Sequence, residues 1–186
     1  MSLQWISTDK IYIYIVAEVK TESDKIKIKE YLQVLNKFTS LTTENFKSLK
    51  EISFFPKELD LFELNSNYHS EVISLLGEDL NNNVSQFVEI INDINKSKPN
   101  KSCYVACQQL GGNTKKLNSY PSLFIHTNSS WKPWIFASWE RNNIRDKEIS
   151  LNWMNESWCK LKKLFPNIHL AQLHNHLQTH DEEVTR

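Results

Sequence analysis

The sequence predicts an α+β fold with a mostly antiparallel sheet and helices packed on one face. Apolar residues change repeatedly between a period of two and a helical period along the 186 residues, which indicates alternating strands and helices. Strand-like runs in the second half are joined by short, turn-rich connections that suit antiparallel neighbours. The hydrophobic content is 40%, and the sequence contains no internal repeat or linker. Both observations favour a single domain that comprises residues 1–186.

The first half of the chain yields strands and two helices. A β-branched and aromatic run predicts a central strand at 11–19. Helices are predicted at 21–38 and 83–97 from their apolar spacing. The two apolar faces consist of Ile28, Tyr31, Leu32, Leu35 and Phe38, and of Val84, Phe87, Val88, Ile91 and Ile94. We also expect a strand at 48–55 and short helices from Pro56 to Leu80.

The second half yields most of the sheet. Strands are predicted at 102–110, 122–127 and 134–140, separated by Gly-Gly-Asn, Asn-Ser-Ser and Pro133. The period then returns to that of a helix at 147–165, closed by Pro166. Its apolar face consists of Ile149, Trp153, Trp158, Leu161 and Phe165. A last strand is predicted at 168–177.

Two of the three glycines, Gly111 and Gly112, stand side by side after the apolar run "CYVACQQL". Glycine is favoured where the backbone takes positive φ or where another group comes close. A plain hairpin turn and a turn beside a pocket both explain the pair.

Charge and cysteine content narrow the classes of function. With 22 basic and 22 acidic residues, the chain lacks the electrostatic footprint of a protein that binds nucleic acid or an anionic membrane. No apolar stretch approaches the roughly 20 residues of a membrane-spanning helix. We therefore expect a small molecule or a protein as partner. Cys103 and Cys107 lie in a strand-like run and are predicted to be core thiols rather than a metal or redox pair.

An ordered set of short motifs resembles a known family. The set is "QQLGGN", "SYPSLFIHT", "WIFASWE", "LNWMNESWCKLKKLFP" and "LHNHL". It is similar to the second half of FAD-linked oxidases of the berberine bridge enzyme type. That half contains a strand ending Q-x-x-G-G, a segment like A-F-x-H-R, a strand with Trp, a W-x-x-x-x-W helix and a strand with Y-x-N. The matching residues are Gln108 or Gln109, Gly111, Gly112, Phe124, His126, Trp139, Trp153, Trp158 and Asn175.

The resemblance covers residues 101–186 by motif and 11–100 by element order only. It implies a substrate-binding domain whose sheet roofs the flavin ring, with a small-molecule substrate. It also implies that FAD is held mainly by a separate glycine-rich domain of the full-length protein. The sequence stops at Arg186, before the position at which the family's C-terminal helix and Y-D-P-x-N-x-F segment are expected. The chain is thus interpreted as an excised, truncated domain that is inactive when isolated.

The resemblance also implies roles for individual residues. Gln109, Gly111, Gly112 and Leu173 would line the substrate pocket, and Asn175 would contact the flavin. Two departures from the family weaken this transfer of roles. Leu173 replaces the Tyr of Y-x-N and cannot exchange a proton, and Thr127 replaces an Arg that could meet an acidic substrate.

Histidines are candidates for the missing base. His126 and His176 are predicted to handle protons. In a strand, His174 and His176 share one face and Asn175 points to the other. Hydrogen-bonded or solvated histidines at the edge of the core explain the same pattern. A His pair near Asp181 fits no strong zinc spacing, so no metal is expected.

Two functions from different classes fit these observations. The first is an enzyme domain that helps to transfer a hydride from an alcohol or an activated C–H group to FAD. The second is a non-enzymatic binding or interaction module on the same scaffold, which the loss of the family's Tyr favours. Five tryptophans fit either core packing or a stacking surface, and their spacing favours the core: Trp131, Trp134, Trp139, Trp153 and Trp158.

Overall fold

The computed structural model describes residues 1–7, 10–15, 19–38, 67–111 and 128–168. The chain forms two compact units, one made of residues 1–14 and 65–186 and the other of residues 15–64. Among the described residues, no helix has the length and apolar character needed to cross a bilayer.

The described part of the smaller unit is dominated by helix α1 (Glu22–Phe38), which confirms the helix predicted at 21–38. Thr21 and Asp24 cap its first turn reciprocally. The Thr21 hydroxyl oxygen accepts from the Asp24 backbone N–H at 3.2 Å, and the Asp24 carboxylate accepts from the Thr21 N–H at 2.9 Å. Hydrogen bonds from the Thr21 hydroxyl and backbone hold the pKa of Asp24 below its usual value.

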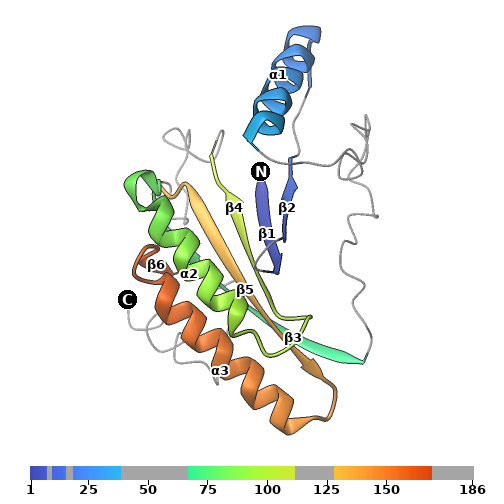
Figure 1. The fold of residues 1–186 in the computed structure, drawn as a ribbon, viewed down its shortest axis with the longest axis vertical. Coiled ribbons are helices and arrows are strands. Elements are labelled where there is room, and N and C mark those ends of the chain that lie inside the picture. The colour runs from blue at the N-terminus through green and yellow to red at the C-terminus, as the bar shows by residue number, and fades with distance from the viewer. Residues whose placement is uncertain (8–9, 16–18, 39–66, 112–127, 169–186) are drawn as a thin grey trace, which may run out of the picture. The chain divides into compact units, whose positions relative to one another are not determined.

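The larger unit contains a six-stranded sheet in which all neighbouring strands are antiparallel (Figure 1). Its order is β2-β1-β4-β5-β3-β6. The strands are β1 (Ser2–Ser7), β2 (Lys10–Tyr14), β3 (Tyr68–Leu76), β4 (Tyr104–Gln109), β5 (Trp131–Glu140) and β6 (Asn167–Ile168). The predicted antiparallel α+β fold is therefore confirmed.

Helices α2 (Val84–Lys96) and α3 (Ile144–Leu161) pack side by side on one face of this sheet (Figure 1). A short 3-10 helix, η2 (Asn81–Asn83), leads into α2. Phe87, Ile91 and Ile94 of α2 are buried as predicted, whereas Val84 and Val88 are exposed. The helix follows the predicted period, but its buried stripe is narrower than the sequence indicated.

Helix α3 begins three residues before its predicted start because Asn143 caps it. The Asn143 side-chain oxygen accepts from the Asp146 N–H at 3.0 Å. Trp153, Trp158 and Leu161 are buried as predicted. Ile149 is 46% exposed, so its placement on the apolar face was wrong.

Two strands were missed in the sequence. The short helices expected between Pro56 and Leu80 are wrong at 68–76, where β3 pairs with both β5 and β6. No strand was predicted before residue 11, yet β1 lies between β2 and β4. The strand predicted as central at 11–19 is β2, which lies at the edge of the described sheet, so its central position was wrong. The strands predicted at 48–55 and 122–127, and most of that at 168–177, lie outside the described residues.

Strand β5 starts at Trp131 rather than at 134, and Pro133 lies inside it. Proline cannot donate a backbone hydrogen bond and is unfavourable in a central strand. The β3–β5 pairing runs only to Ser74 and Trp134, and it resumes as an isolated bridge between Gly77 and Trp131. Pro133 thus lies where the β3–β5 ladder is interrupted, while its pairing with Cys107 of β4 continues.

Gly77 is needed for a close approach of two segments. A Cβ atom built on Gly77 would lie 2.6 Å from Cδ1 of Phe165 and 3.2 Å from its Cα. Phe165 is fully buried, so neither its ring nor its backbone has room to yield. We expect Gly77→Ala to lower the free energy of unfolding by about 1–3 kcal/mol, measured by urea denaturation. An unchanged midpoint would show that the segment carrying Phe165 moves freely.

Cys103 and Cys107 are free and buried, which confirms their prediction as core thiols, while Cys159 is exposed on α3. Burial raises the pKa of both core thiols, and only the thiolate is a nucleophile. In the native protein at pH 8, we expect iodoacetamide to label Cys159 alone. All three should react in denaturant. Native labelling of Cys107, read by peptide mass spectrometry, would contradict this packing.

Candidate functional site

The strand register separates the two faces of the sheet. Val105 lies opposite Ile135, and both are fully buried in the core that α2 and α3 cover. Trp5 of β1 packs edge-on against Phe87 of α2 at 5.6 Å, so it belongs to this face as well. Because side chains alternate along a strand, the residues between these point to the opposite face. This far face comprises Gln4, Ser74, Tyr104, Ala106, Gln108, Lys132, Trp134 and Phe136.

Two neighbouring rows cross the centre of the far face. In one row, Ser2 lies opposite Gln108, which lies opposite Lys132. In the next row, Gln4 lies opposite Ala106, which lies opposite Trp134. The far face thus places an ammonium, two carboxamides and an indole ring on three adjacent strands.

Lys132 and Trp134 form the centre of this arrangement. They are two residues apart on β5 and therefore share a face. The Lys132 ammonium nitrogen lies 4.0 Å from the centre of a Trp134 ring, in cation–π geometry. Partial burial lowers the pKa of Lys132. A half-buried cation stacked on an aromatic ring is thereby held on the far face.

Two further rings extend the aromatic surface. Tyr104 of β4 stacks on Phe136 of β5, with 4.2 Å between ring centres and an interplanar angle of 16°. Both residues are half-buried, as is Trp134, whereas the aromatic residues of the core are buried. Half-buried, stacked rings are typical of surfaces that bind planar ligands.

Gln4 adds an unsatisfied donor. Its side chain is only 2% exposed, and its Nε2 atom has no hydrogen-bond partner in the described part of the chain. Buried amide nitrogens are nearly always paired, since an unpaired one costs about 1–3 kcal/mol. Such an atom on a sheet face indicates a position where a ligand acceptor would be favourable.

The glycine-containing end of β4 is described in part. Gly111 has a φ of +153°, which favours glycine, and no atom lies within 4 Å of a Cβ built on it in the described structure. Backbone conformation, and not a close neighbour, therefore explains Gly111. Gln109 is exposed at the end of β4, and by alternation it points away from the far face to which Gln108 belongs.

The other predicted site residues lie outside the described residues. They are Gly112, His126, Leu173, Asn175 and His176. Of the six histidines, His69 alone falls in the described part, where its ring lies 6.3 Å from that of Trp139. In that part, no group of three His, Cys, Asp or Glu side chains could hold a metal ion.

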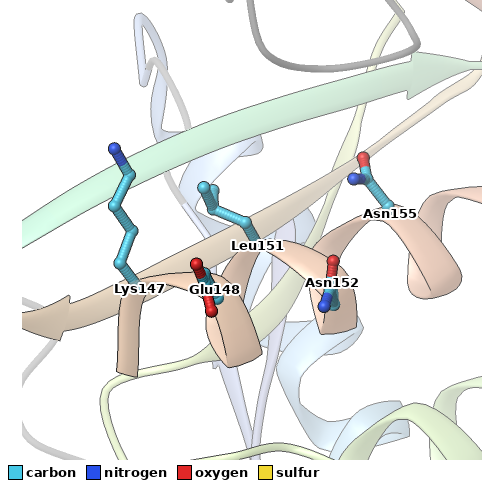
Figure 2. A pocket seen from close by; sticks show the side chains of 5 residues that line it. All are labelled: Lys147, Glu148, Leu151, Asn152 and Asn155. Atoms are coloured by element: carbon cyan, nitrogen blue, oxygen red, sulfur yellow. The ribbon is translucent and has the colours of Figure 1, made fainter. Parts of the chain in front are cut away.

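Two surface depressions have fewer groups that could bind a ligand than the far face has. One is lined by residues of a single helix, α3, that follow one another along it: Lys147, Glu148, Leu151, Asn152 and Asn155 (Figure 2). The other lies beside the end of β3 and is lined by Glu78, Asp79, Asn81, Asn128 and Ser130. Neither depression contains an aromatic ring, and neither brings a cation and an unpaired buried donor together.

Two residues of the far face, Gln4 and Lys132, were not singled out in the sequence, whereas Gln108 was matched to the family motif and Trp134 was considered for a stacking surface. Gln4 belongs to a strand that was not predicted, and Lys132 lies before the predicted start of β5. The prediction of core packing is confirmed for Trp139, Trp153 and Trp158. Trp134 is instead half-buried on the far face. The spacing of Lys132 and Trp134, two residues apart in a strand, could have indicated that both side chains lie on the same face of the sheet.

Comparison with known proteins gives a distant similarity. No protein-family model and no curated protein sequence matches the chain. A solved structure of a BBE-like 1 variant from Physcomitrella patens is similar over 61% of this chain, with 15% sequence identity and a TM-score of 0.41. The similar region spans 24% of the length of that chain.

Proposed function

We propose that this chain is the substrate-binding domain of an FAD-dependent oxidoreductase that transfers a hydride from an alcohol or an activated C–H group to flavin. The proposal depends on the difference between the two faces of one sheet. Helices α2 and α3 close one face over an apolar core. The far face offers half-buried rings with ammonium and amide donors, which complement a planar ring that carries carbonyl oxygens.

In this proposal a separate domain of the full-length protein holds most of the FAD. The chain has three glycines in 186 residues, too few for a glycine-rich loop that cradles a pyrophosphate. When bound, the flavin would supply the redox chemistry by accepting the hydride. The residues of this chain would orient the substrate, exclude water and accept the hydroxyl proton.

We propose that Asn175 contacts the flavin at the far face of the sheet. Asn175 lies outside the described residues, so this assignment depends on the resemblance of "LHNHL" to the family's Y-x-N strand.

Side-chain alternation in the strand predicted at 168–177 assigns the remaining candidates. His174 and His176 would point away from the face of Asn175, so we propose His126 as the preferred acceptor of the substrate's hydroxyl proton. Leu173, Gly111 and Gly112 would contribute to the walls of the substrate pocket, whereas Gln109 points away from the far face and would lie outside that pocket.

The proposal is tested by comparing this chain with the product of its complete gene. We expect residues 1–186 to be colourless and to leave added FAD fluorescence unquenched. The complete product should carry one flavin per chain, measured by its visible absorption after purification. A complete product without flavin would contradict the function, and tight stoichiometric FAD binding by residues 1–186 would contradict the division of labour between domains.

A further inference from the structure

Lys132 is a half-buried cation that has no counter-ion among the described residues. In the described residues, no carboxylate forms an ion pair with it, and burial is the sole cause of its lowered pKa. The Trp134 ring at 4.0 Å offsets part of the desolvation. Buried charges are normally paired, so this ammonium favours an anion from outside the chain.

The neighbours of Lys132 are suited to the same anion. Gln108 lies directly opposite it and is exposed, and therefore has a carboxamide N–H₂ available. Gln4, diagonal to Gln108 on the next strand, is buried with an unpartnered Nε2 in the described structure. The three side chains supply hydrogen-bond donors, and a carboxylate group accepts two or three such bonds.

We propose that Lys132, Gln108 and Gln4 bind the carboxylate of a planar organic acid whose ring lies on the Trp134, Phe136 and Tyr104 surface. Taking this acid as the substrate rests on the proposed flavoenzyme function, whereas the anion site itself does not. Thr127 stands where the family has an Arg that could bind an acidic substrate. In this proposal, Lys132 provides the cation that this Arg would otherwise provide. It makes the substrate class an alcohol or activated C–H compound that also carries a planar ring and a carboxylate, in place of a neutral alcohol.

Benzoate and its neutral isostere benzamide are suitable probes. With ¹⁵N-labelled residues 1–186, we expect benzoate to shift the side-chain amide signals of Gln4 and Gln108 and the indole signal of Trp134. Benzamide at the same concentration should shift them much less, since it lacks the charge. Equal responses to the two probes, or no response to benzoate, would overturn the anion site.

Substitutions locate the charge. Lys132→Met keeps the length of the side chain and should weaken benzoate binding at least about tenfold, whereas Lys132→Arg should retain it. Lys162→Met is the matched control, because the Lys162 ammonium also lies over a Trp ring, at 4.5 Å from that of Trp158. Lys162→Met should leave binding unchanged. If Lys132→Met does not fold, Gln108→Ala, a substitution at an exposed position, replaces it as the test. Loss of benzoate binding in Gln108→Ala would support the site, and unchanged benzoate binding would contradict it.

The outcomes separate this inference from the proposed function. Benzoate binding through Lys132 in a protein whose complete gene product lacks flavin would keep the anion site and reject the enzyme. In a complete flavoprotein, Lys132→Met should slow flavin reduction by substrates that carry a carboxylate. The rate of flavin reduction by neutral alcohols should be unchanged. If both substrate classes respond equally, the carboxylate is not part of the substrate.

Discussion

Replacing Trp153 by alanine should lower the free energy of unfolding by about 3–5 kcal/mol, the range for loss of a buried aromatic residue. Trp153 is buried in α3, and its ring nitrogen donates to the backbone oxygen of Ile94 in α2 at 3.1 Å. The substitution removes both core volume and the hydrogen bond that joins the two helices covering the sheet.

Ile149→Ala is the matched control on the same helix. Because Ile149 is 46% exposed, its truncation should change the free energy of unfolding by less than about 0.5–1 kcal/mol. Urea denaturation followed by circular dichroism measures both variants. Similar losses in the two would mean that α3 is rotated relative to the described packing.

In the complete protein, Asn175→Ala should slow flavin reduction by substrate by about 10²-fold, the usual cost of a lost hydrogen bond to developing charge. The reason is the proposed position of Asn175 on the far face, beside the flavin ring. Stopped-flow absorbance under anaerobic conditions measures the reduction directly and separates it from later reoxidation.

His176→Ala provides the comparison, because side chains alternate along the predicted strand at 168–177 and His176 would point away from the face of Asn175. It should change the reduction rate severalfold at most. If His176→Ala abolishes reduction and Asn175→Ala leaves it intact, the register is displaced by one residue and the histidine is the functional group.

Local periodicity was sufficient for the helices and for the centres of β4 and β5, because their buried residues repeat at the spacing of the element itself. It failed at β3, whose apolar residues Val72, Ile73, Leu75 and Leu76 follow a helix-like spacing. That segment is a strand because β5 and β6 flank it, and this pairing between distant segments is not encoded locally. β1 is short and similarly depends on its two neighbours.

The candidate site shows the same division. The need for glycine at Gly111 was visible in composition, and the structure attributes it to backbone conformation. The far face could not be predicted, since it joins Gln4, Gln108 and Lys132 from three strands whose register only the folded sheet defines. A single sequence reveals which side chains alternate along a strand, but not which strands lie side by side.

The central claim is that the far face of this sheet covers the flavin in a larger enzyme, and a crystal structure of the complete protein with bound flavin tests it most directly. We expect the flavin ring to face this side of the sheet, within van der Waals distance, about 4 Å, of Asn175 or of a substrate that lies on Trp134. A flavin that contacts only α2 and α3, or one that is remote from this sheet, would contradict it.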